Sequence, residues 1–186
     1  MTPPCTPGGA WIQTYTGVAF PLLEPDERHV NSVDIAHALA RLCRFGGHSR
    51  RFYSVAQHSV LVARWLRDQG YHRDVVRHGL LHDAAEAYVV DVPRPLKQLL
   101  QRHAEIEHQV QRAIWAAFRM RPEIPAAVHE ADQRILADER QHVMGPCDVD
   151  WCLREKPLGL PASDFDAWMP AIAERRFNDM LLELVP

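Results

Sequence analysis

The chain has 186 residues, of which 47% are hydrophobic and 24% charged, and its formal net charge is -3. This length suffices for one domain that buries most of its apolar surface and needs no stabilising cross-links such as disulfide bonds. The composition excludes a disordered or fibrous protein. Because the balance is slightly acidic, nucleic acid and anionic membrane are disfavoured partners, and any phosphate ligand must meet locally placed positive charge.

The cysteines and the first residues of the chain indicate the cellular compartment in which the protein is expected. Cysteines stand at positions 5, 43, 147 and 152 without a CxxC pair, and TPPCTPGG near the start lacks a charged and apolar leader. Reduced thiols and a cytoplasmic location are therefore expected. Cys147 and Cys152 lie near His142, which leaves a zinc site open, but a loop is favoured because the spacing is unlike that of known zinc knuckles. No apolar run reaches the roughly 18 residues of a membrane span.

The N-terminal part differs from the rest in its pattern. Residues 1–31 are rich in proline, glycine and threonine, and TYTGVAF (14–20) alternates around Gly17, which predicts a short hairpin. Helical periodicity then begins at Ser32, interpreted as an N-cap. The segments expected to be helical are SVDIAHALARLCR (32–44), SVAQHSVLVARWLRDQG (54–70, capped by Ser54 and closed by Gly70), RDVVRHGLLHDAAEAY (73–88), a short one in VDVPRPLKQLL (90–100), HAEIEHQVQRAIWAAF (103–118), PAAVHEADQRILADERQHVM (125–144) and SDFDAWMPAIAERRFNDMLLELV (163–185).

These segments predict an all-α bundle of about six or seven helices with a small N-terminal β or loop decoration. Residues 32–186 are expected to form the bundle as a single domain, and residues 1–31 an extension of it. Pro170 is expected in the first turn of the last helix, since proline is tolerated there.

Three of the predicted helices carry metal-ligand side chains on apolar faces. His58 lies on the second helix, His82 and Asp83 are neighbours on the third, and Asp132 lies on the 125–144 helix. Buried carboxylates without a partner are costly or become protonated, so these groups need a cation if they meet. Two imidazoles and two carboxylates suit Mn, Fe, Co, Ni or Zn, with Mg also acceptable, and leave positions for water as a catalytic metal requires.

Each of these residues has an ordinary alternative when it is taken alone. A histidine on an apolar face is most often a core residue bonded to a backbone carbonyl, and Asp132 could cap a helix or pair with Arg134. Four such residues on three amphipathic helices are harder to explain separately. The occurrence of all four residues together favours a metal site.

The order His58, His82-Asp83, Asp132 resembles the HD-domain phosphohydrolase superfamily over roughly residues 32–144, with SVAQHS, LLHDAAEAYVVDVPRPLK and EADQRILADE around these positions. The chain is most similar to small bacterial and phage nucleotide hydrolases, namely deoxynucleoside 5'-monophosphatases and compact deoxynucleoside triphosphate triphosphohydrolases. The resemblance implies a compact helical HD domain in which these four residues bind the metal.

Metal-assisted phosphoester hydrolysis also needs a group that handles the attacking water and one that protonates the leaving oxygen. The resemblance implies these roles for Glu86, one turn after the dyad, and Asp91, which precedes the proline turn. The alternatives are a solvated glutamate on a helix face and an aspartate that caps the PRPLKQLL helix.

Phosphate binding requires basic side chains near the site. Arg51 and Lys97 occupy positions where similar nucleotidases place substrate-contacting bases, and Arg44 matches another arginine of the family if a one-residue gap is allowed. Arg94 is a further candidate by its position in the sequence. Phe45 could stack on a base, but a core or loop role is favoured.

The expected function is therefore a metal-dependent phosphohydrolase acting on (deoxy)nucleotides, with a 5'-deoxynucleotidase that releases phosphate from deoxynucleoside monophosphates favoured. One alternative is a deoxynucleoside triphosphate triphosphohydrolase, for example on dATP, that releases triphosphate. Another is a non-catalytic nucleotide-binding regulatory module. The expected partners are a small-molecule nucleotide and further copies of the chain in a homo-oligomer, to which the apolar C-terminal helix could contribute; no membrane partner is expected.

Overall fold

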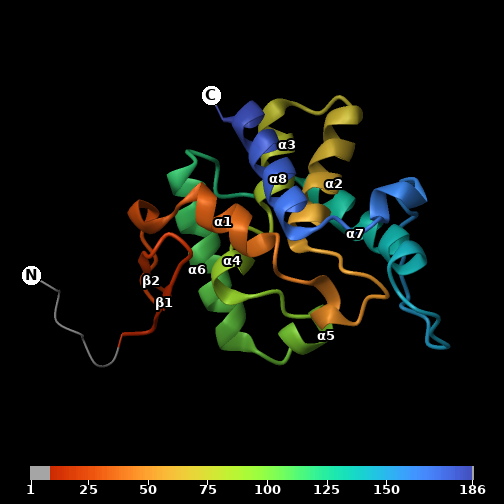
Figure 1. Cartoon of the computed structure of the whole chain (residues 1–186), viewed down its shortest axis with the longest axis horizontal. Coiled ribbons are helices and arrows are strands. Elements are labelled where there is room, and N and C mark those ends of the chain that lie inside the picture. The colour runs from red at the N-terminus through yellow and green to blue at the C-terminus, as the bar shows by residue number, and fades with distance from the viewer. Residues whose placement is uncertain (1–8, 186) are drawn as a thin grey trace, which may run out of the picture.

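The computed structural model describes residues 9–185, and these form an all-α bundle with a small N-terminal hairpin, as predicted (Figure 1). Six helices have eight or more residues, and two are single turns, which agrees with the expected six or seven. The elements are β1 (Trp11–Gln13), β2 (Ala19–Pro21), α1 (Ser32–Leu39), α2 (Val55–Asp68), α3 (Arg73–Leu81), α4 (Glu86–Val89), α5 (Arg94–Lys97), α6 (Gln101–Ala117), α7 (Ala126–His142) and α8 (Pro170–Leu184), with short 3-10 turns at Glu27–His29, Arg44–Gly47 and Ala162–Phe165.

The N-terminal hairpin is antiparallel and turns at Gly17, whose positive φ of 89° suits glycine. Residues 1–8 of the expected extension lie outside the described range. Phe20 of β2 is fully buried and stacks on Tyr88, with ring centroids 3.9 Å apart. The Thr16 backbone N–H and hydroxyl donate to the carboxylate of Asp34 on α1 at 2.7 and 2.8 Å. The hairpin therefore contributes to the same core as the helices.

The ends of the first two helices follow side-chain capping. Ser54 caps α2 as predicted, since its hydroxyl accepts from the Gln57 N–H. The prediction that Ser32 caps α1 is wrong: Asn31 has the extended backbone of an N-cap, and its side chain accepts from the Val33 N–H at 2.9 Å. The helix also ends at Leu39, earlier than position 44.

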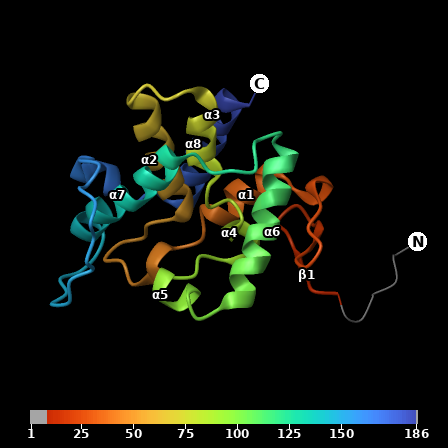
Figure 2. The same ribbon diagram turned by 180° about the vertical axis from the view of Figure 1, so that it is seen from behind.

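The third predicted helix is interrupted at the His82-Asp83 dyad, so the expectation of one helix over 73–88 is wrong. In a continuous helix the Ala85 N–H would donate to the Leu81 carbonyl. Instead, Gln111 of α6 inserts between them, accepting from the Ala85 N–H at 3.0 Å and donating to the Leu81 carbonyl at 2.8 Å. Residues 82–85 form turns between α3 and α4, and α6 packs against α4 (Figure 2).

Helices α2, α3 and α8 pack together, and α7 lies against α2 and α3 (Figure 1). Pro170 begins α8, as predicted. The close approach of α2 to α3 depends on Gly79, because a Cβ there would lie 2.5 Å from Leu66 Cδ1 and 3.5 Å from the Ala63 Cα. Within residues 9–185, no helix has both the length and the apolar character needed to cross a bilayer.

The cysteines found in the described part of the chain are free thiols, as predicted: Cys43 is half-buried, and Cys147 and Cys152 are exposed. Cys5 lies outside the described residues. The candidate metal-binding cluster of His58, His82, Asp83 and Asp132 contains none of these thiols.

We expect Gly79→Ala to lower the free energy of unfolding. Alanine gains about 1 kcal/mol of helix propensity over glycine, but forcing a methyl group against a buried leucine costs about 1–3 kcal/mol. Denaturant unfolding should show a net loss relative to the wild type. Gly145→Ala is the control, because its Cβ would meet no atom within 4 Å; equal midpoints for the two variants would contradict the packing argument.

Candidate metal centre

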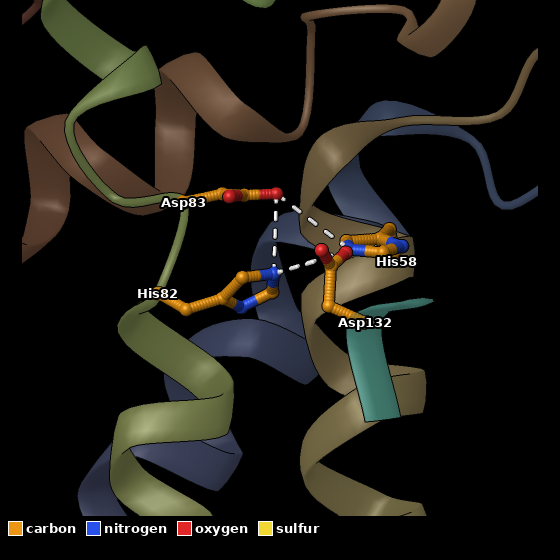
Figure 3. Close-up of side chains that lie close together, drawn as sticks. All are labelled: His58, His82, Asp83 and Asp132. Atoms are coloured by element: carbon orange, nitrogen blue, oxygen red, sulfur yellow. Dashed lines mark hydrogen bonds and ion pairs between the residues drawn. The ribbon is translucent and has the colours of Figure 1, made fainter. Parts of the chain in front are cut away.

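The structure brings the four predicted metal ligands together (Figure 3). His58 comes from α2, His82 and Asp83 from the break between α3 and α4, and Asp132 from α7. Each offers one ligand atom, and these atoms lie within 4.8 Å of one another. The His58 side chain is fully buried, that of His82 is 6% exposed, and those of Asp83 and Asp132 are 23% exposed. The His₂Asp₂ cluster can hold a metal ion.

The distances within the cluster fit a single shared cation. The His58 Nε2 atom lies 3.3 Å from Asp132 Oδ1, and the His82 Nε2 atom lies 3.2 Å from Asp83 Oδ2. The crossed pairs, His58 with Asp83 and His82 with Asp132, measure 3.6 and 3.7 Å. Two atoms that each bind an ion at about 2.1 Å can be at most about 4.2 Å apart, so all four distances are compatible with one ion.

The hydrogen bonds of the two imidazoles leave their Nε2 atoms available as ligands. His82 Nδ1 lies 2.8 Å from the Gly79 carbonyl, which can only accept, so this nitrogen carries the proton. His58 Nδ1 likewise donates to the Glu139 carboxylate at 2.8 Å. In the neutral rings, both Nε2 atoms then present lone pairs, and they face each other at 3.3 Å. Such an arrangement repels unless a cation or a proton lies between the two nitrogens.

The pKa shifts of His82 and Asp132 also indicate that the cluster favours a bound positive charge. Burial alone would lower the pKa of His82, but the carboxylates of Asp83 and Asp132 raise it well above its usual range. Burial would raise the pKa of Asp132, but hydrogen bonds from His58 and His82 bring it well below the ordinary value. A bound proton can thus balance the aspartates in the absence of metal, and metal binding would release it.

Glu139 is a site residue that the sequence reasoning missed. It is fully buried, and besides orienting His58 it accepts from the Arg44 guanidinium, with Nη2 3.3 Å from Oε2. Burial would raise the pKa of Glu139, but Arg44 and His58 lower it, so the carboxylate stays ionised. A signal was present in the sequence, since Glu139 lies two helical turns after Asp132 and thus on the same face of α7.

A pocket of about 690 Å³ opens beside the cluster. Glu86 is the first residue of α4 and is only 5% exposed. Its Oε2 atom has no hydrogen-bond partner among the described residues. Burial, with Asp83 and Asp91 adding repulsion, raises the pKa of Glu86 well above its usual range. The charged residues that line the pocket are Arg44, Asp83, Glu86, Asp91, Arg94, Lys97 and Asp132.

Asp91 follows α4 and is half-buried in the pocket wall. Burial raises its pKa, and the Asp83 carboxylate adds to this effect although Arg44 opposes it. The residue before it, Val90, has a positive φ of 65°, an unusual conformation for a β-branched side chain. The backbone at Val90 therefore directs the chain out of α4 at the point where Asp91 enters the pocket.

Two of the three predicted substrate-binding bases line the pocket. Arg44 is buried, and its Nη1 atom lies 3.5 Å from Asp83 Oδ2, so the guanidinium reaches the cluster directly. Burial alone would lower the pKa of Arg44, but Glu139 and Asp83 raise it, so it remains charged. Lys97 forms an ion pair with Glu107 at 2.6 Å.

The third predicted base, Arg51, lies elsewhere: it pairs with Asp166 at 2.8 Å and is not among the residues that line the pocket. Asp166 is 115 residues from Arg51 in the sequence, so the spacing of neighbouring residues could not predict this ion pair. Arg94 does line the pocket, and its Nη2 atom is 3.7 Å from Asp132 Oδ2. Lining residues to which the sequence reasoning gave no role include His48, Trp151 and Leu153.

No protein-family model matches the chain. Over 178 residues it is 32% identical to the uncharacterized protein YfdR of Escherichia coli strain K12, an alignment that covers 92% of this chain and 96% of YfdR. The chain belongs to the YfdR family. It is also 30% identical over 127 residues to an uncharacterized protein of Rhodobacter capsulatus, which covers 66% of this chain and 65% of that protein. Neither name specifies an activity.

In this YfdR family member we expect Glu139→Gln to weaken metal binding about 10- to 100-fold, because the carboxylate that orients His58 and makes its ring more basic is lost. Titration calorimetry with Mn²⁺ measures the affinity directly. Glu130→Gln on the same helix is the control, since Glu130 is exposed and forms its ion pair with Arg134, away from the cluster. An unchanged affinity in Glu139→Gln would refute the orienting role.

Metal should also stabilise the fold. A ligand at 100 times its Kd adds about 2.7 kcal/mol to the free energy of unfolding. Chelator-treated wild-type protein should therefore gain thermal stability when Mn²⁺ is restored, whereas Asp132→Asn should gain far less, because it has lost one ligand. The same gain in both proteins would place the ion elsewhere.

Proposed function

We propose that this chain is a metal-dependent phosphohydrolase of nucleotides, acting as a 5'-deoxynucleotidase that releases phosphate from deoxynucleoside monophosphates. The observation that carries the proposal is the pair of facing Nε2 atoms, bracketed by Asp83 and Asp132, at a pocket that also contains basic side chains. The resemblance of His58, His82-Asp83 and Asp132 to the ligands of HD-domain phosphohydrolases supports the choice of a phosphoester substrate.

The charge of the pocket explains why the reaction would need a metal. Four carboxyl groups and three basic side chains line it, so a phosphate dianion would meet repulsion beside the aspartates. A divalent ion held by His58, His82, Asp83 and Asp132 would supply the missing positive charge and polarise the phosphoryl group. Arg44, with its guanidinium beside Asp83, would bind a phosphate oxygen and hold the ester in place.

Two carboxyl groups have the properties required for proton transfer. The Oε2 atom of Glu86, which has no hydrogen-bond partner among the described residues, would accept a proton from the attacking water once a nearby bound cation favours the ionised carboxylate. Asp91, whose pKa is also raised, would hold a proton and donate it to the leaving oxygen of the sugar.

One observation favours the second candidate, a deoxynucleoside triphosphate triphosphohydrolase. Arg94 and Lys97 of α5 line the pocket with side chains that are 61% and 31% exposed, so they could follow a phosphate chain toward solvent. The two candidates differ in their products, because one releases phosphate from the monophosphate and the other releases inorganic triphosphate.

The proposal is tested with a panel of deoxynucleoside mono- and triphosphates, assayed with Mn²⁺, Co²⁺, Zn²⁺ and Mg²⁺ in turn. Phosphate released from the monophosphates supports the nucleotidase, and triphosphate released from deoxynucleoside triphosphates replaces it with the second candidate. Binding without turnover under any metal would favour the regulatory module instead. Full activity in Asp83→Ala would refute the metal mechanism.

We expect Glu86→Gln to lower kcat about 10²- to 10⁴-fold while the affinity for Mn²⁺ stays close to that of the wild type, because Glu86 handles protons and is not a ligand. Steady-state kinetics and calorimetry together separate the two effects. Glu105→Gln on the exposed face of α6 is the matched control. A fall in metal affinity that accounts for the whole loss of activity would show that Glu86 acts on the metal instead.

A further inference from the structure

The pocket has an apolar, aromatic part that the proposed hydrolysis does not use. Trp151 and Leu153 line it from the segment between α7 and α8, and Phe45 lines it from the Arg44–Gly47 turn. The Phe45 and Trp151 ring centroids are 5.9 Å apart, with their planes inclined by 54°. Metal binding and proton transfer require charged groups, so these rings need another explanation.

The indole of Trp151 is fixed by its neighbours. The guanidinium of Arg140 on α7 lies 5.8 Å from the ring centroid, and the same arginine pairs with Asp150 at 2.9 Å. The Asp150 carboxylate in turn accepts from the Cys152 N–H at 3.1 Å, and Cys152 has a positive φ of 52°. Trp151 therefore lies between Asp150, whose carboxylate pairs with Arg140, and Cys152, whose backbone N–H donates to that carboxylate.

The same segment is anchored a second time before it reaches α8. The buried carboxylate of Asp138 on α7 accepts from three successive backbone N–H groups, those of Leu158, Gly159 and Leu160, at 2.6 to 3.0 Å. Both anchors are on the helix that carries Asp132. The position of Trp151 relative to the metal centre is thus set by α7.

A planar aromatic surface beside a phosphate-binding region matches the chemistry of a nucleotide. The charged groups would take the phosphate, and an indole offers its π-face to a heteroaromatic ring. We propose that Trp151 is the platform on which the nucleobase of the substrate stacks, with Leu153 and Phe45 completing the apolar wall. The inference rests on the proposed function, since it assigns the base end of the same substrate.

The test compares Trp151→Ala with the wild type on two substrates. For deoxynucleoside monophosphates, KM should rise about 5- to 150-fold with little change in kcat, because a stacked base is lost. For 2-deoxyribose 5-phosphate, which has no base, both constants should stay the same. Trp151→Phe should restore most of the lost affinity, and Trp11→Ala, at an exposed tryptophan of β1, is the control.

Equal losses on both substrates in Trp151→Ala, or no loss on either, would overturn the inference while leaving the proposed hydrolysis intact. If the wild type hydrolyses no nucleotide, the proposed function fails, and the base platform is then judged by calorimetry with the four deoxynucleosides, which lack phosphate. Binding to the wild type that is weakened at least about 5-fold in Trp151→Ala supports the platform. No binding, or equal binding to both proteins, overturns it.

Discussion

Two imidazole nitrogens that face each other at 3.3 Å, both with their proton on the opposite ring nitrogen, are the constraint around which this structure is arranged. His58 lies on α2 and His82 directly follows α3, and these two helices pack closely at Gly79, where a Cβ would lie 2.5 Å from Leu66 Cδ1. The Gly79 carbonyl also accepts a hydrogen bond from Nδ1 of His82, which orients the ring and keeps the proton on that nitrogen. The same residue thus contributes to the packing of α2 on α3 and to the tautomer of His82. Glu139 of α7 likewise accepts a hydrogen bond from Nδ1 of His58 and orients that ring.

The break between α3 and α4 places the cluster at the wall of the pocket. Because Gln111 takes the backbone groups of Leu81 and Ala85, the chain turns after His82, and Asp83 enters the cluster from a turn instead of a helix face. Glu86 then begins a new helix at the wall of the pocket. The buried positive charge of Arg44 is balanced by Glu139 on one side and Asp83 on the other, so the guanidinium remains charged in the pocket wall beside Asp83.

The sequence predicts those parts of the fold and site that depend on neighbours along the chain. Apolar periodicity and the Ser54 and Gly70 signals locate the long helices, and ligand-type residues on apolar faces locate the four residues of the His₂Asp₂ cluster, which can hold a metal ion. Features that depend on distant partners could not be predicted this way. The interruption at 82–85 is caused by a side chain on α6, and Arg51 is paired with Asp166 across the fold. Trp151 lies in a segment rich in turn-forming residues, and its contacts in the pocket are with residues distant in the sequence, namely Phe45 and Arg140 of α7.

The arrangement of the two Nε2 atoms and the two aspartates predicts one cation between them. Anomalous diffraction from crystals soaked in Mn²⁺ tests it most directly. We expect one strong anomalous peak at bonding distance from Nε2 of His58, Nε2 of His82 and the carboxylates of Asp83 and Asp132. No peak at this position, or a peak bound elsewhere with the imidazoles unliganded, would contradict it.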